Sequence, residues 1–374
     1  MPFLYDPSRP DFADRAYQIY RELRDDHPVY RNPEDGSYAL SRFEDVRTAA
    51  SDAARLSSRN TRISTGLLPM MQQLDPPRHD ALRNLVQRAF TPRRVAEFEP
   101  RVREISRELI DHLAGEGRCD LKRAFCEQLP SRVIGELIGV PAERRGDFLE
   151  WTEAMVATGP VGDAPRHIYA EFAKLLEERR RERRDDLMSA LLDAEVDGQQ
   201  LTEQELLGFC FLLIVAGNDT NNNLLANGAV LSARHPDQRK LLAEEPARIP
   251  QAIEEMLRYE SPTHALPRRA LAQVDFHGVT IPAGAEVLLV WGAANHDERE
   301  FDDPERFDVT REMRRHLAFG QGIHHCLGSN LARLEAKVGF EELLGRIPDY
   351  RLAQEPRWVT SFWARAYESV QITF

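Results

Sequence analysis

The residues with the clearest potential for chemistry lie around one cysteine, in the segment Phe319-Gly320-Gln321-Gly322-Ile323-His324-His325-Cys326-Leu327-Gly328. Glycine lets a backbone turn tightly and approach a ligand closely. The apolar spacing that follows predicts a helix over residues 327–344, and the positive end of a helix dipole stabilises a thiolate next to it. A cysteine considered without its neighbours is more often an inert buried residue than a ligand. The glycines and histidines around Cys326 favour a ligand or a reactive thiolate.

A second candidate lies in the middle of an unusually long predicted helix. Thr202 and Glu205 form a T-x-x-E capping box, and the helical pattern continues to the His-Pro pair at 235–236. That is about 30 residues, or roughly 45–50 Å. Its middle, Ala216-Gly217-Asn218-Asp219-Thr220, places a glycine and polar side chains beside the most apolar stretch of the chain. One interpretation is a kink in which the Thr220 hydroxyl bonds back to the Ala216 carbonyl, and the other is a ligand notch in a buried helix. The residues alone leave both open.

The elements that must position these segments are mostly helices. Apolar residues at helical spacing predict helices at 13–26, 75–90, 95–113 and 123–137. Alternating runs predict strands at 37–41, 274–281 and 286–290, with His277-Gly278 as a turn. No repeat or linker separates these segments, so we expect a single domain over residues 1–374. The expected fold class is mainly α with a small β-rich region.

Composition excludes several classes of protein. The 374 residues carry 49 basic and 61 acidic side chains, a net charge of −12, which disfavours a general binder of nucleic acid or anionic membrane. The four cysteines, at 119, 126, 210 and 326, fit neither a disulfide framework nor a zinc pattern. The longest apolar run is far shorter than the ~20 residues of a membrane span, and the first residues do not form a signal peptide. We therefore expect a cytoplasmic protein with no membrane span.

The cysteine segment resembles the F-G-x-G-x-H-x-C-x-G loop of the cytochrome P-450 superfamily of haem-thiolate monooxygenases. The resemblance implies that Cys326 is the axial thiolate ligand of the iron of haem b, with Phe319, Gly320 and Gly328 forming the loop around the cofactor. His324 would reach a haem propionate. A thiolate pushes electron density onto iron and favours cleavage of the O–O bond. The implied fold is the cytochrome P-450 fold, with the haem buried between the long central helix and the cysteine-loop helix.

Residues that would bind the haem propionates follow in the family's order. The segment 74–83 looks like the family's D-P-P-x-H-x-x-x-R, with His79 and Arg83 on one helical face. Both side chains can donate to a carboxylate. Arg268 stands where the family has another propionate arginine, and its neighbour Arg269 leaves that assignment open by one position.

The family's E-x-x-R motif is matched by Glu255 and Arg258. Residues at i and i+3 share a helical face, so the two side chains can form an ion pair. By resemblance the arginine then bonds backbone carbonyls below the haem, which is a structural role.

The long helix is similar to the family's central helix with its A-G-x-[DE]-T motif. By resemblance Ala216 and Gly217 contact the haem, Thr220 hydrogen-bonds the dioxygen under activation, and Asp219 relays protons from solvent. The run of three asparagines at 221–223 departs from the threonine-rich wording common in bacterial members.

The function implied is a monooxygenase that activates O2 with externally supplied electrons and inserts one oxygen atom into an apolar small molecule. Because no reductase is fused to the chain, the expected partner is a ferredoxin or flavodoxin with its NAD(P)H reductase.

Residues 75–94 carry five arginines and two aspartates, a net charge of +3. With Arg311, Arg314 and Arg315 they are expected to form a basic proximal face that attracts an acidic donor. Two alternatives are a haem-binding sensor without turnover and a peroxide-driven or redox-independent haem-thiolate enzyme, and the Asp219-Thr220 pair favours turnover with delivered electrons.

Overall fold

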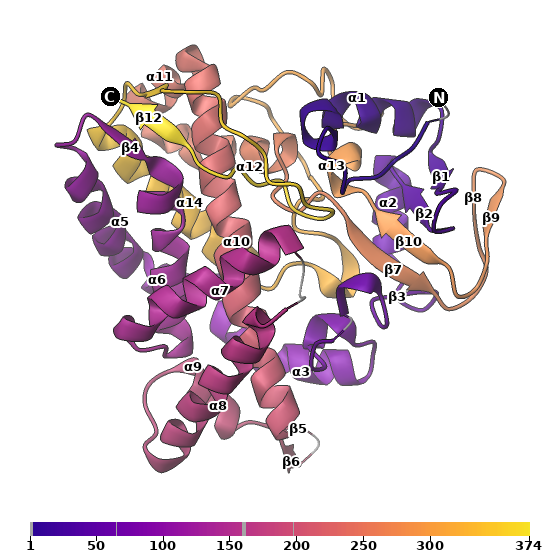
Figure 1. The fold of residues 1–374 in the computed structure, drawn as a ribbon, viewed down its shortest axis with the longest axis horizontal. Helices are drawn as coiled ribbons and strands as arrows, with labels where there is room; N and C mark the ends of the chain where they lie inside the picture. Colours follow the sequence, from indigo (N-terminus) through magenta and orange to yellow (C-terminus); the bar gives the residue numbers. More distant parts are fainter. Residues whose placement is uncertain (1–2, 65, 159–161, 197) are drawn as a thin grey trace. The chain divides into compact units, whose positions relative to one another are not determined.

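The computed structural model describes residues 3–64, 66–158, 162–196 and 198–374 (Figure 1). Contacts divide the chain into two compact units. One comprises Met1–Ile63, Asn227–Cys326 and Pro356–Glu368, and the other comprises Ser64–Ala226, Leu327–Glu355 and Ser369–Phe374. Helices dominate both and the sheets are small, which confirms the expected fold class. The single domain over 1–374 stays a prediction.

The first unit contains the largest sheet of the described chain. Its strand order is β1 (Val29–Arg31), β2 (Tyr38–Leu40), β10 (Glu286–Leu289), β7 (Leu266–Ala270) and β3 (Leu56–Ser57). Only the β2–β10 pair is parallel. The helices of this unit are α1 (Phe12–Asp25), α2 (Phe43–Ser51), α11 (Pro236–Glu244), α12 (Ile249–Tyr259) and α13 (Trp291–Ala294). Leu40, Val287 and Trp291 belong to the apolar core against which the sheet and α2 pack.

A separate hairpin confirms the turn predicted at His277-Gly278. Strands β8 (Val274–Phe276) and β9 (Val279–Ile281) pair in antiparallel fashion around it. Both turn residues have positive φ, 48° and 77°, as a two-residue hairpin turn that follows the right-handed strand twist requires.

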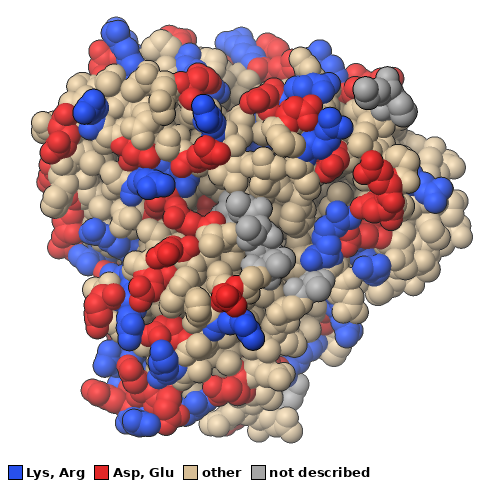
Figure 2. Space-filling model, in the orientation of Figure 1, with Lys and Arg blue, Asp and Glu red and all other residues tan. Residues whose placement is uncertain are grey.

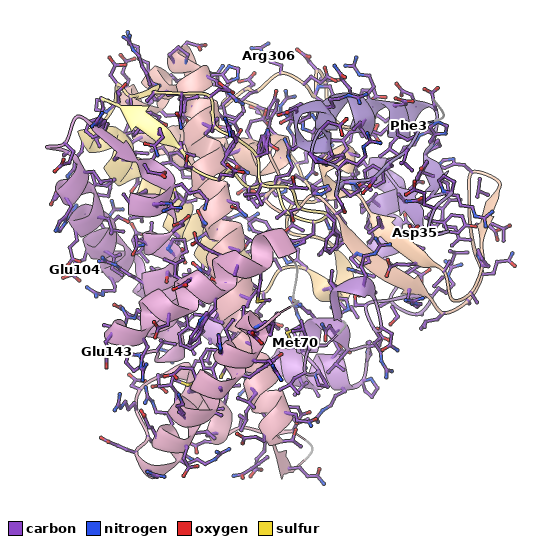
Figure 3. The ribbon with its side chains drawn as sticks, in the orientation of Figure 1. Phe3, Asp35, Met70, Glu104, Glu143 and Arg306 are labelled. Atoms are coloured by element: carbon purple, nitrogen blue, oxygen red, sulfur yellow. The ribbon has the colours of Figure 1, made fainter. Side chains whose placement is uncertain are left out.

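The second unit is a helical assembly. It comprises α3 (Arg78–Gln87), α4 (Pro92–Glu97), α5 (Glu99–Leu113), α6 (Gln128–Ile138), α7 (Arg145–Thr158), α8 (Ala164–Arg181), α9 (Leu187–Leu192) and α14 (Ser329–Arg346). Its small sheets are β11 (Arg351–Leu352), β12 (Gln371–Thr373) and β4 (Arg118–Asp120), and the pair β5 (Glu195–Val196) and β6 (Gln199–Gln200). Helix α5 packs against α14 and α6. Its apolar residues Val102, Ile105 and Leu109 are buried, whereas Glu104 points outward (Figure 3).

Helix α10 (Glu203–Arg234) is the long helix predicted from the sequence, and it has 32 residues. The capping box is confirmed: the Thr202 N–H donates to Glu205 Oε2 at 3.0 Å, and the Glu205 N–H donates to Thr202 Oγ1 at 3.3 Å. Residues up to Ala226 belong to the second unit, and the remainder belong to the first. No helix in the described ranges is both long and apolar enough to cross a membrane.

Several predicted helix boundaries are wrong, and proline explains two of them. The helix expected over 95–113 is split at Phe98, because Pro100 occupies the first turn of a new helix. The helix expected from residue 75 begins at Arg78, after two prolines. The segment expected at 123–137 is a π-helical turn, Lys122–Cys126, followed by α6. Helix α14 begins at Ser329, two residues later than expected.

Candidate functional site

The cysteine segment of the first unit folds back on itself. The Cys326 N–H donates to the Phe319 carbonyl at 2.8 Å, and the Gly320 N–H donates to the Leu317 carbonyl at 2.9 Å. Between them, Gly322–His324 form a single 3-10 turn. Gly322 has φ +73°, and a Cβ there would lie 2.6 Å from the Ala50 carbonyl oxygen of α2. The glycine therefore allows the segment to rest directly on α2, and Phe319, Gly320, His324 and Cys326 are brought into one turn.

The other three thiols differ electrostatically from a ligand thiolate. Burial raises the pKa of Cys119 to about 11 and that of Cys210 to about 12. Burial also raises the pKa of Cys126 well above its ordinary value. A thiol held neutral in this way is a poor nucleophile and a poor metal ligand. Cys326 is half-buried and stands in a loop shaped for close approach.

Strand β7 places two neighbouring arginines on opposite faces. Arg269 donates to the Asn60 carbonyl at 2.7 and 3.1 Å and to the Gly284 carbonyl at 2.8 Å, so its guanidinium is committed to loop backbone. Arg268 is buried and donates to the carbonyl of its neighbour Pro267 at 2.9 Å. Because successive strand residues alternate in direction, only one of the two can face a common ligand. Because the guanidinium of Arg269 is already hydrogen-bonded to the Asn60 and Gly284 carbonyls, Arg268 is the better candidate for binding that ligand.

Helix α3 of the second unit carries the predicted His79 and Arg83. His79 is fully buried, and its Nδ1 lies 2.8 Å from Asp80 Oδ1. Arg83 follows one turn later and is half-buried. The start of α3 is tied to the start of α10, because Arg78 Nε donates to Glu205 Oε1 at 2.9 Å.

The middle of α10 combines burial with two accessible positions. Residues 211–214 are buried, and so are Asn218 and Asp219, yet Ala216 is exposed and Thr220 is partly exposed. Thr220 Oγ1 donates to the Ala216 carbonyl at 2.8 Å, which confirms the backbone bond expected of the kink interpretation. Ala216 and Thr220 are one turn apart and share the accessible face, and the ligand notch stays a prediction.

Gly217 faces away from that accessible strip. A Cβ at this position would lie 2.8 Å from Ile134 Cγ1 on α6. What the structure shows for Gly217 is therefore close packing of α10 on α6, and a contact of Gly217 with haem stays a prediction.

Asp219 is enclosed, and its ionisation is displaced toward neutral pH. Burial raises the pKa of Asp219 to about 7, and the negative charge of Glu153 acts in the same direction. The charge of Lys122 and a hydrogen bond with Thr152 oppose the shift. Thr152 also accepts a hydrogen bond from Asn218 Nδ2 at 2.7 Å. An acid of this kind can hold or release a proton near neutral pH.

The asparagine run supplies a partner that sequence reasoning missed. Asn221 Nδ2 donates to Glu335 Oε2 on α14, and both side chains are buried. Burial raises the pKa of Glu335 to about 8. The signal in the sequence was a glutamate, Glu335, placed directly between apolar residues of the 327–344 helix. A buried acid needs a donor, and a helical pattern does not say which distant residue provides it.

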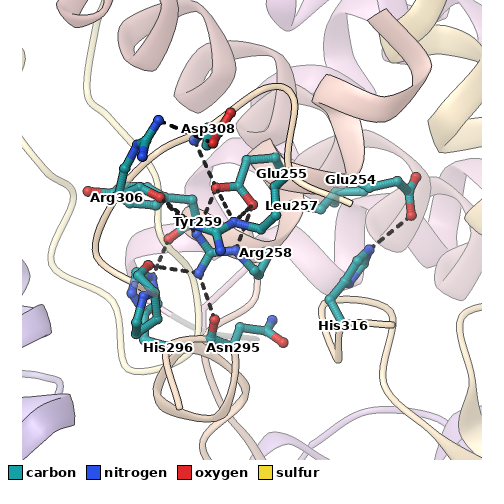
Figure 4. A network of polar contacts seen from close by, with 12 residues as sticks. Glu254, Glu255, Leu257, Arg258, Tyr259, Asn295, His296, Arg306, Asp308 and His316 are labelled. Carbon is teal, nitrogen blue, oxygen red and sulfur yellow. Dashed lines mark hydrogen bonds and ion pairs between the residues drawn. The ribbon is translucent and has the colours of Figure 1, made fainter. Parts of the chain in front are cut away.

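The E-x-x-R pair is confirmed as a buried structural cluster (Figure 4). Arg258 donates to both carboxylate oxygens of Glu255 at 2.7 Å. Its Nη1 also donates to the Asn295 and Pro304 carbonyls, each at 2.9 Å. The arginine thus fixes two loops of the first unit to α12.

Comparison with known proteins gives consistent matches over nearly the whole chain. The family model described as Cytochrome P450 matches residues 163–347. Cytochrome P450 107B1 of Saccharopolyspora erythraea is 40% identical over 96% of this chain and 95% of its own length. Vitamin D(3) 25-hydroxylase of Pseudonocardia autotrophica is 41% identical over 91% and 89%. The structure of cytochrome P450 CYP109Q5 from Chondromyces apiculatus superposes with a TM-score of 0.91 at 40% identity, covering 99% of this chain and 97% of that one.

Proposed function

The chain belongs to the cytochrome P450 superfamily of monooxygenases, and from this premise we propose that the thiolate of Cys326 would hold a haem b by binding its iron. The reaction we propose is insertion of one oxygen atom of O2 into an apolar small molecule, with electrons delivered by a separate protein. Two observations support the proposal. The central-helix motif, the E-x-x-R pair and the cysteine loop occur along the chain in the same order as in the family, and a relative is named as a hydroxylase.

The observation that carries the proposal is the loop in which Cys326 stands, whereas the other three cysteines lie in β4, in the π-helical turn at 122–126 and in α10. Cys326 is half-buried in a glycine loop closed by its own N–H on the Phe319 carbonyl. The residues present fit a haem: the first unit offers a thiol on a close-approach loop, and the second offers the small, exposed Ala216 in an otherwise buried stretch of α10. When bound, the haem would supply reductive activation of dioxygen, assisted by electron donation from the thiolate.

Cationic and imidazole side chains would bind the propionates. We assign Arg268 and His324 of the first unit and His79 and Arg83 of the second to this task. Arg268 is preferred over Arg269 because the guanidinium of Arg269 already donates to the Asn60 and Gly284 carbonyls. Charge-assisted hydrogen bonds of this kind fix the orientation of a planar group as well as its affinity.

Asp219 and Thr220 would handle protons at the middle of α10, Asp219 from a buried position and Thr220 from the accessible face. With its pKa raised to about 7 by burial, the Asp219 carboxyl can take up a proton and release it at neutral pH. Thr220 Oγ1 gives its own proton to the Ala216 carbonyl, so its lone pairs are directed to accept a hydrogen bond. In this proposal Asp219 stores and releases the proton, and the Thr220 hydroxyl accepts a hydrogen bond in a fixed direction.

The partners that we propose follow from chemistry and from the relatives. A relative named for hydroxylating vitamin D(3) makes bulky apolar molecules the first substrate class to test. The electron donor would be an acidic ferredoxin or flavodoxin with its reductase, docking near Arg88. This residue is exposed, and no ion pair of its guanidinium occurs in the described part of the chain.

The test is a full accounting of electrons with vitamin D(3) as the first probe. Wild type, Thr220→Ala and Thr220→Ser are supplied with reduced ferredoxin, and donor oxidised, peroxide released and product formed are measured. We expect wild type to form product and Thr220→Ala to divert roughly tenfold more electrons to peroxide, because general acid–base groups contribute about 10²–10⁴ in rate. Thr220→Ser retains the hydroxyl and should direct nearly as large a fraction of the electrons to product as wild type does.

Three outcomes would contradict the proposal. Product from peroxide alone, without donor, would indicate the peroxide-driven alternative. Haem-band shifts with no substrate turnover across a panel of apolar compounds would indicate a sensor. Unchanged coupling in Thr220→Ala would remove this hydroxyl from proton handling.

A further inference from the structure

The residues that precede the cysteine loop are held by side chains outside the family motifs named so far. His316 is almost fully buried, with 4% of its side chain exposed, and its Nε2 lies 3.1 Å from Glu254 Oε2 on α12 (Figure 4). Its other ring nitrogen, Nδ1, accepts the Ala318 N–H at 3.1 Å. Because Nδ1 is an acceptor, the proton of the neutral ring lies on Nε2 and is donated to Glu254.

Asn295 holds the next residue along the chain. Its side chain is completely buried, its Oδ1 accepts the Leu317 N–H at 2.7 Å, and its Nδ2 donates to Ser261 Oγ at 2.8 Å. The backbone carbonyl of Asn295 is one of the two that Arg258 Nη1 binds. Asn295 therefore joins the E-x-x-R cluster directly to the segment that leads into the cysteine loop.

Backbone hydrogen bonds connect the anchored residues to Cys326. The Leu317 carbonyl, fixed by the bond at its own N–H, accepts the Gly320 N–H at 2.9 Å. Phe319, which lies between these two residues, accepts the Cys326 N–H at 2.8 Å. Only Leu317 and Ala318 thus lie between His316 and Phe319, whose carbonyl orients Cys326.

We propose that His316 and Asn295 are positioning residues that set the orientation of Cys326, with Glu254 acting through His316. The inference rests on the proposed function, because the orientation of Cys326 matters only if its thiolate binds haem iron. The adjacent acids of α12 would then have separate tasks. Glu255 binds Arg258 and Arg311, whereas Glu254 binds His316, which lies just before the cysteine loop in the chain.

The experiment uses the haem-loaded protein and two readouts other than activity. We measure the fraction of the ferrous carbon-monoxide complex that shows the red-displaced thiolate band, and the exchange rates of the Leu317, Gly320 and Cys326 amides. His316→Ala and Asn295→Ala should each speed exchange of these amides roughly tenfold and convert a measurable fraction to the neutral-thiol form, since a buried hydrogen-bonding group is lost.

Matched variants separate positioning from general destabilisation. His316→Gln retains a donor and an acceptor and should recover most of the thiolate band. His277→Ala removes an exposed histidine bound to Asp45 at 2.7 Å and should leave both readouts unchanged. Where His316→Ala folds, adding Glu254→Gln to it should cause no further loss of the thiolate band, because the two side chains form one pair. If His316→Ala does not fold, Glu254→Gln alone tests the same pair.

The outcomes distinguish this inference from the proposed function. A wild type without the thiolate band would contradict the proposed function itself. A wild type with the band, together with unchanged band and amide exchange in His316→Ala and Asn295→Ala, would overturn the positioning role alone.

Discussion

Glu335 is a carboxylic acid inside the apolar packing between α14 and α10, and its ionisation is linked to folding. Burial raises the pKa of Glu335 to about 8, against about 4.3 in an unfolded chain. The folded protein therefore binds a proton that the unfolded chain has lost between about pH 4 and pH 8. The contribution of Glu335 to the free energy of unfolding is therefore fully present below about pH 4 and is lost as the pH rises through about 8.

Glu335→Gln should remove this pH dependence. Glutamine stays neutral and can still accept the hydrogen bond of Asn221 through its side-chain oxygen. We expect the variant to be more stable than wild type above pH 8, by about 1–4 kcal/mol, and close to wild type at pH 4–5. Denaturant unfolding of both proteins at pH 5 and pH 9 measures the difference.

Glu341→Gln is the matched control on the same helix. Glu341 is bound by Arg103 at 2.6 Å and Lys337 at 3.3 Å, so its loss should give no gain at high pH. Asp219, whose pKa is also raised, is present in all three proteins and cancels in the comparison. Parallel stability curves for wild type and Glu335→Gln would show that this carboxyl is not protonated in the folded state.

At the scale of elements, the sequence predicted the features that depend on local pattern. The capping box at Thr202, the length of α10 and the hairpin turn at His277 follow from rules that act within a few residues. The E-x-x-R pair was predictable because i and i+3 always share a helical face. The cysteine loop was predictable because its glycines and thiol are adjacent in the chain.

Features that depend on distant neighbours were not predictable from the same patterns. Nothing in the sequence near Gly217 shows that Ile134 of α6 lies against it, or that Asn60 and Gly284 engage Arg269. The choice between Arg268 and Arg269 needed strand direction and loop contacts. The helix break at Phe98 was missed because the apolar period continues across it while Pro100 begins a new turn.

The whole molecule is acidic, and its arginines are largely neutralised by neighbours. On the face drawn in Figure 2, basic and acidic residues are interspersed. Arg311 binds Glu255 and loop carbonyls, and Arg315 binds Glu300, so these side chains offer less positive charge than their sequence implied. Arg94 is paired with Glu97. Arg93 is also exposed and lies 3.8 Å from the same glutamate, whereas Arg88 is exposed and forms no ion pair in the described ranges, so we place the docking proposal on Arg88.

Arg88→Glu tests this placement through first-electron transfer from an acidic ferredoxin. At low ionic strength the variant should react severalfold more slowly than wild type, and the difference should shrink as salt screens charges over a Debye length of about 8–10 Å. Arg181→Glu makes the same charge change at a residue of α8 whose side chain is 76% exposed, and it should leave the rate nearly unchanged. Equal rates for Arg88→Glu and wild type at every salt concentration would place the donor elsewhere.

The central claim for the molecule is that Cys326 binds haem iron as a thiolate. The most direct measurement is the absorption spectrum of the ferrous carbon-monoxide complex of haem-loaded wild type and Cys326→Ser, with Cys119→Ala, Cys126→Ala and Cys210→Ala as controls. We predict a red-displaced band in wild type and in the three controls, and its loss in Cys326→Ser. A haem-loaded Cys326→Ser with the wild-type spectrum would contradict the account.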